Sequence, residues 1–133
     1  MLKPKEAHNE YHGIIVNLSQ KDKSIVKNLN VIGRKRVLFG LITLYKISVN
    51  ENAIDKVIIE VQKNMNDRIL FKKQEFYAHF YRNNELIIVF RDKIFKVTPD
   101  PTTWGEAVRH GRLLNIADGQ LDFIPNRFED ETF

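Results

Sequence analysis

Three side chains that could take part in chemistry stand at alternate positions between Glu75 and Thr98. They are Tyr77, His79 and Tyr81, and alternation places them on one face of a β-strand. Histidine can act as a general acid or base close to neutral pH, so His79 is the weak catalytic candidate of the chain. Sequence spacing ties no second catalytic residue to it. A half-buried histidine bonded to a neighbouring tyrosine is the alternative interpretation.

The same face also suits a ligand or a single-stranded nucleic acid. Arg82 and Arg91 lie near the three rings in the sequence, and aromatic platforms combined with cations bind single strands. We therefore expect a binding surface formed by Tyr77, His79, Tyr81, Arg82 and Arg91 if helices leave this face open. Core packing or self-association would account for the aromatic residues equally well.

Composition narrows the classes of function. The chain has no cysteine, which excludes disulfides, thiol catalysis and cysteine-bound metals. It contains no glycine-rich phosphate loop, nucleophile elbow or paired zinc-binding histidines, and we expect neither a metal nor a cofactor. The net charge of +4 permits contact with polyanions, but the positive residues are spread along the whole chain. An enzyme is therefore less expected than a binding protein.

The first residues carry charge but no apolar signal-peptide core. The longest apolar run, Val37 to Tyr45, is about half the length of a membrane span. These observations favour a soluble, cytoplasmic protein without a membrane partner.

The first half of the chain predicts strand, helix, strand, helix. A compact apolar run covers His12 to Leu18, and Ser19 begins a helical pattern that Gly33 would end. Val37 to Val49 favours a strand through its β-branched residues, with a helix as the alternative. A helical stripe of apolar residues then joins Ile54 to Met65.

The second half predicts a three-stranded meander followed by a helix. Asn83-Asn84 suits a two-residue turn, and a second turn is expected around Asp92. Thr103 and Glu106 match a capping box at the start of the last helix. The apolar residues from Leu121 to Phe128 are too many for a free tail, so we expect them to contact the domain or a second copy.

The fold class that follows is α+β. We expect a two-layer sandwich, ferredoxin-like in character, with a mixed or antiparallel sheet of about four or five strands and about three helices. The chain divides into a flexible N-terminus (1–10), a single domain (11–116) and a docked C-terminal segment (117–133).

The function expected from these features is binding. The favoured hypothesis is a small, non-catalytic interaction protein that self-associates as a homo-oligomer and contacts a protein. One alternative is a small enzyme or ligand-binding protein with a pocket at the sheet face around His79. The other is binding of single-stranded nucleic acid through the strand of Tyr77, His79 and Tyr81.

Overall fold

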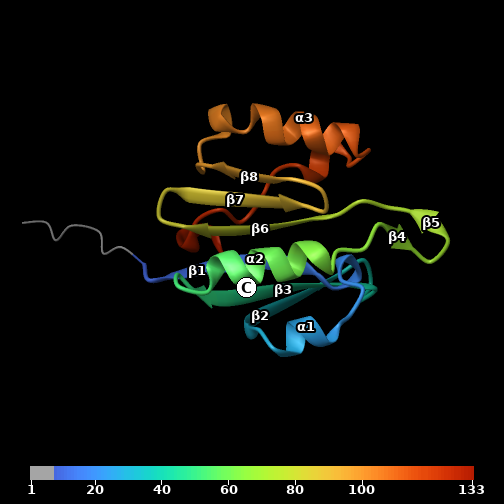
Figure 1. Cartoon of the computed structure of the whole chain (residues 1–133), viewed down its shortest axis with the longest axis horizontal. Coiled ribbons are helices and arrows are strands. Elements are labelled where there is room, and N and C mark those ends of the chain that lie inside the picture. Colours follow the sequence, from blue (N-terminus) through green and yellow to red (C-terminus); the bar gives the residue numbers. More distant parts are fainter. Residues whose placement is uncertain (1–7) are drawn as a thin grey trace, which may run out of the picture.

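Six strands form one antiparallel sheet in the computed structural model, which describes residues 8–133 (Figure 1). The expected α+β class is confirmed, with more strands than predicted. The six strands are β1 (Glu10–Val16), β2 (Asn30–Val37), β3 (Ile42–Asn50), β6 (Tyr77–Arg82), β7 (Glu85–Phe90) and β8 (Ile94–Val97). A separate small hairpin is formed by β4 (Arg68–Ile69) and β5 (Lys72–Lys73).

Strand β1 lies in the middle of the sheet, in the order β2-β3-β1-β6-β7-β8. It pairs with β3 on one side and with β6 on the other. The predicted meander is confirmed as β6, β7 and β8, and Arg82 pairs with Glu85 across the predicted Asn83-Asn84 turn. Asn83 has a positive φ of 46°, which asparagine tolerates better than most residues.

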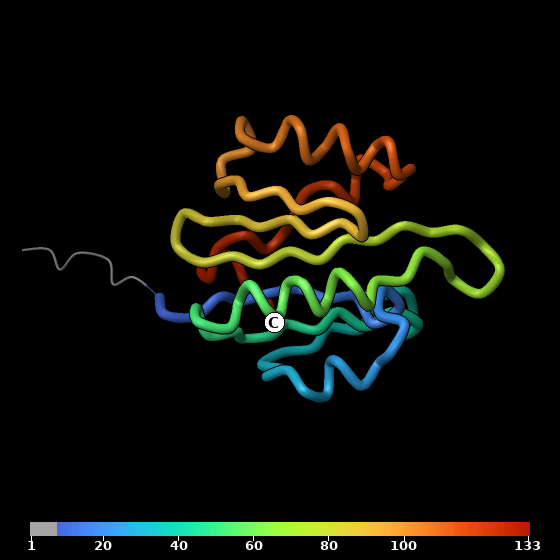
Figure 2. Tube along the Cα trace, in the orientation of Figure 1, coloured from blue at the N-terminus to red at the C-terminus, as the bar shows by residue number. Residues whose placement is uncertain are grey.

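Helices and the C-terminal segment cover both faces of this sheet. On one face α2 (Ile54–Lys63) buries the apolar stripe that the sequence predicted. On the other face α3 (Gly105–Leu113) and the C-terminal segment form a second core around Phe90 and Phe123. Figure 2 shows the C-terminal segment, in red, behind the strands and opposite α2. The two-layer sandwich and the ferredoxin-like character that we expected are therefore not confirmed.

The expected helix after Ser19 is mostly absent. Only Ser24–Lys27 is α-helical, as α1, and β2 begins at Asn30. Backbone bonds explain the difference: Lys21 N donates to Asn64 O, and Asn66 N donates to Ser19 O. These bonds attach the segment after Ser19 to the end of α2. The residues from Asn30 onward then pair with β3 as strand β2, and this pairing outweighs the helical spacing of the apolar residues in the sequence. Gly33 lies within β2 and is not a helix cap.

The apolar run from Val37 to Val49 is not one strand. Val37 ends β2, a turn follows, and β3 starts at Ile42. Leu38, Phe39 and Gly40 have positive φ values of 51°, 57° and 83°. Leucine and phenylalanine are unusual at such positions, where asparagine and glycine are favoured. Periodicity did not reveal this turn because its residues are as apolar as the strands beside it.

The start of α3 and the N-terminal residues differ from expectation. Thr103 lies in a short 3₁₀ helix and bonds Asp100 O, so it does not cap α3 as predicted. The expected flexible region falls largely on residues 1–7, which lie outside the described residues, and Glu10 already belongs to β1. None of the helices among residues 8–133 has the length and apolar character needed to span a bilayer.

Candidate functional site

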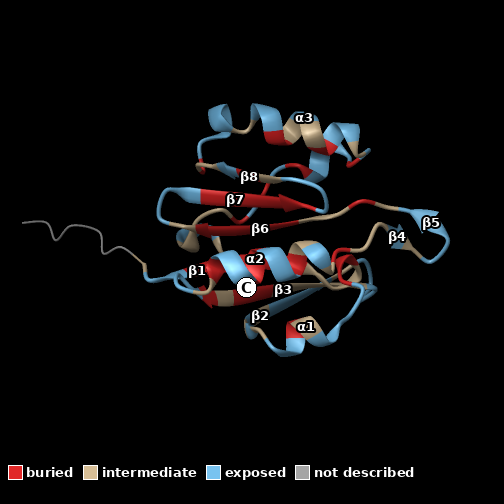
Figure 3. Ribbon diagram, viewed as in Figure 1, coloured by how far each residue is buried: buried red, intermediate tan, exposed pale blue. Residues whose placement is uncertain are grey.

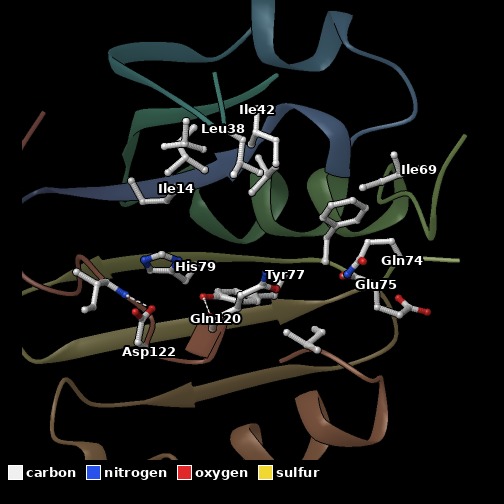
Figure 4. Close-up of a pocket in the computed structure, with 16 residues that line it drawn as sticks. Ile14, Leu38, Ile42, Ile69, Gln74, Glu75, Tyr77, His79, Gln120 and Asp122 are labelled. Carbon is white, nitrogen blue, oxygen red and sulfur yellow. Dashed lines mark hydrogen bonds between the residues drawn. The ribbon is translucent and has the colours of Figure 1, made fainter. Parts of the chain in front are cut away.

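A cavity of about 440 Å³ opens between the sheet and the C-terminal segment. Figure 4 shows that its walls come from both sides: Ile14 and Ile42 from the sheet, and Gln120 and Asp122 from the C-terminal segment. The volume is typical of a site for a small molecule. The chain therefore has a partly open, ligand-sized cavity on the same sheet face as His79.

Register explains why the wall residues gather here. Ile14 of β1 lies opposite His79 of β6, and Val16 lies opposite Leu44 of β3. Residues directly opposite each other in an antiparallel pair point to the same face. Val37 and Ile42 extend this wall at the end of the β2–β3 hairpin.

His79 is buried in this wall, with 3% of its surface exposed. Its Nε2 lies 2.8 Å from Pro125 O. Because a carbonyl oxygen only accepts hydrogen bonds, Nε2 carries the hydrogen. No group among residues 8–133 is bonded to Nδ1. Burial lowers the pKa of His79 from 6.5 to about 4, although the bond to Pro125 opposes the shift, so the ring is uncharged at neutral pH.

Tyr77 lies beside His79 in the same wall. Its hydroxyl donates a hydrogen bond to Gln120 O, and its ring contacts Phe123 edge-on at 5.2 Å. Burial raises the pKa of Tyr77, and the negative charge of Asp122 raises it further. The hydroxyl therefore stays protonated and fixes the C-terminal segment to β6.

Tyr81 is fully buried and takes part in a different cluster. Its hydroxyl donates to Glu131 Oε2 at 2.6 Å, and His12 Nδ1 lies 2.6 Å from the same oxygen. Lys46 Nζ lies 3.6 Å from the other oxygen, Oε1. Phe128 stacks on the His12 ring at 3.7 Å. This cluster holds the end of the C-terminal segment on the sheet.

Both arginines of the expected binding surface are engaged in ion pairs. Arg82 contacts Glu51 at 2.6 Å and Glu85 at 2.7 Å. Arg91 contacts Glu75 at 2.8 Å. The structure thus places Tyr77 and His79 at one site and Tyr81 at another, and the two arginines serve neighbouring carboxylates. The open aromatic face considered above is instead covered by residues 115–133, because apolar residues such as Phe123 pack against it.

Several residues of the cavity wall could not be predicted from sequence patterns. Gln120 and Asp122 lie far from β6 in the chain, and Phe76 precedes the strand but still lines the cavity. The only signal was the apolar run after Leu121, which indicated docking without giving its place. Among the described residues, no group of three or more histidine, aspartate or glutamate side chains is arranged to hold a metal ion.

No known protein family, curated protein or solved structure matches this chain. What the protein does must therefore be argued from the geometry of its own residues.

Proposed function

We propose that this protein binds a small, mainly apolar molecule in the cavity between the sheet and the C-terminal segment. The observation that carries the proposal is the cavity itself, about 440 Å³ in volume and lined mostly by aliphatic side chains. Ligand sites of soluble proteins combine such apolar walls with a few polar groups. This develops the hypothesis of a pocket around His79.

The polar groups in the wall favour an apolar occupant. His79 is uncharged at neutral pH, and the Tyr77 hydroxyl is used by Gln120. The Glu75 carboxylate forms an ion pair with Arg91 at 2.8 Å. An apolar ligand therefore removes little hydration from these groups when it displaces water from the cavity.

Binding is favoured over catalysis by the surroundings of His79. A catalytic histidine needs a proton donor or acceptor within reach in the substrate or the protein. Among residues 8–133 the His79 ring hydrogen-bonds the backbone carbonyl of Pro125, and no hydroxyl or carboxylate of these residues is bonded to it. We therefore assign His79 to the cavity wall.

A neutral fluorescent dye, Nile red, tests the proposal. Ile42 lines the cavity, so Ile42→Trp should fill part of it and weaken Nile red binding by about tenfold or more. Ile59→Trp is the matched control, because Ile59 is an exposed residue of α2 on the other face. Equal dye binding by both variants and the wild type, with unchanged melting temperatures, would exclude the cavity as the site.

Self-association is the second candidate, and a specific observation favours it. Phe39 and Phe71 lie fully exposed on two turns, with relative exposures of 106% and 98%. Leu38, Leu41 and Leu70 on the same two turns are also exposed, and groups of exposed apolar residues mark contact surfaces. Single-stranded nucleic acid is not proposed, because His79 and Tyr81 are buried and Arg82 and Arg91 are paired.

A further inference from the structure

Two exposed turns flank the open side of the cavity. Leu38 of the β2–β3 turn and Ile69 of the β4–β5 hairpin both line it. Figure 3 shows this hairpin and β2 as exposed, in contrast to the buried central strands. Four further apolar side chains on the same turns are exposed: Phe39, Leu41, Leu70 and Phe71. The apolar wall of the cavity thus continues onto the surface.

The turns that carry these residues are basic. No aspartate or glutamate occurs between Asp22 and Glu51. None of the exposed cations of β2 and the β4–β5 hairpin forms an ion pair with any residue among 8–133. These cations are Arg34, Lys35, Arg36, Arg68, Lys72 and Lys73. Such an uncompensated group attracts anions.

Strand register places two of these cations on the same strand faces as residues that line the cavity. Lys35 lies opposite Leu44, and Lys72 lies opposite Ile69. Leu44 and Ile69 both line the cavity, and opposite residues in an antiparallel pair share a face. Lys35 and Lys72 are therefore on the cavity side of their hairpins. By the same alternation Arg36 and Lys73 are on the other side.

We propose that the ligand is an anionic amphiphile whose apolar chain fills the cavity and whose carboxylate or phosphate is bound by Lys35 and Lys72. This inference rests on the function proposed above and adds the chemical class of the ligand. The lining carboxylates do not oppose it. Glu75 is paired with Arg91, and Figure 4 shows Asp122 on the opposite side of the cavity from Leu38 and Ile42.

Two probes with the same apolar chain test the role of charge. Decanoate and decanol differ in their head group, and each is added below its aggregation limit to displace Nile red from the full chain. We expect decanoate to bind about fivefold or more tightly than decanol at low salt, as two exposed ion contacts would give. The preference should shrink as salt is raised, because salt screens exposed charges.

Two double variants locate the head group. Lys35→Met with Lys72→Met should abolish the preference for decanoate and leave decanol binding unchanged. Methionine retains most of the unbranched apolar stem. Arg36→Met with Lys73→Met removes the same charge on the other side of the two hairpins and should retain the preference. Loss of the preference in both variants, or in neither, would overturn the assignment of Lys35 and Lys72.

The remaining outcomes separate this inference from the proposed function. If decanoate and decanol bind equally well, the cavity is a binding site but the ligand is not selected for its charge. If neither displaces Nile red and Ile42→Trp has no effect, the proposed function itself fails. Co-sedimentation with phosphatidylglycerol vesicles without decanoate binding would indicate adsorption to an anionic surface and would also overturn the inference.

Discussion

His79 is a titratable residue buried away from water. It is 3% exposed, its one hydrogen bond within residues 8–133 is to the Pro125 carbonyl, and burial lowers its pKa from 6.5 to about 4. The folded protein therefore resists protonation of a group that the unfolded chain protonates near pH 6.5. His79 therefore lowers the free energy of unfolding in acid but not at neutral pH.

We predict a pH dependence of stability that belongs to this residue. As the pH falls from 6.5 to about 4, the unfolded state takes up a proton and the folded state does not. The free energy of unfolding should drop by roughly 3 kcal/mol over this window. Above pH 6.5 both states are neutral at this position, and no such loss occurs.

His79→Gln isolates this contribution. Glutamine can still donate to the Pro125 carbonyl but does not titrate. Urea unfolding at several pH values should show the wild type losing stability faster than the variant between pH 6.5 and about pH 4. Parallel curves for the two proteins would show that His79 is protonated in the folded state as readily as in the unfolded chain.

Among the elements, the C-terminal segment determines whether the aromatic face of β6 is buried or open to solvent. It covers Tyr77, His79 and Tyr81 and supplies one wall of the cavity. Glu131 is its last strong attachment, because its two carboxylate oxygens contact Tyr81, His12 and Lys46. A stacking surface would exist only without this segment.

We predict that Glu131→Ala destabilises the protein by about 3 kcal/mol, because it removes the carboxylate that pairs with the buried Lys46. Lys46 is 7% exposed. The matched control is Asp118→Ala, which breaks an exposed pair with Arg112 and should change stability little. Urea unfolding measures both, and limited proteolysis should cut the Glu131→Ala variant first within residues 117–133. Equal effects of the two substitutions would contradict the role given to Glu131.

Sequence reasoning found the elements that are local. Helix α2 and the β6–β8 meander have strong periodicity and clear turn residues, such as Asn83. The predictions were wrong or incomplete where a segment distant in the sequence supplies the hydrogen-bond or packing partner. Residues 20–22 lie outside any helix because backbone bonds hold this segment at the end of α2, and the cavity exists only because residues far apart in the chain meet over His79. Long-range pairing of this kind leaves no periodic signal.

At the scale of the whole molecule, one buried core lies on each face of the sheet. The apolar turns of the β2–β3 and β4–β5 hairpins belong to neither core. Leu38, Phe39 and Leu70 adopt positive φ values of 51°, 57° and 54°, which cost free energy for bulky residues. Asparagine or glycine would form these turns more easily. The apolar residues on these turns therefore support the self-association proposed above.

We predict that copies of the protein associate through these turns and that association strengthens as salt is raised. Apolar contact between exposed phenylalanines favours association, while the surrounding cations repel one another until salt screens them. Sedimentation velocity at low and moderate salt should show the average mass rising with salt and with protein concentration. The double variant Phe39→Ser with Phe71→Ser should remain monomeric throughout.

The control, Ile59→Ser with Leu113→Ser, removes exposed apolar residues from α2 and α3 and should associate like the wild type. Association that weakens with salt would instead indicate pairing of opposite charges, and association that survives loss of both phenylalanines would place the contact elsewhere on the molecule.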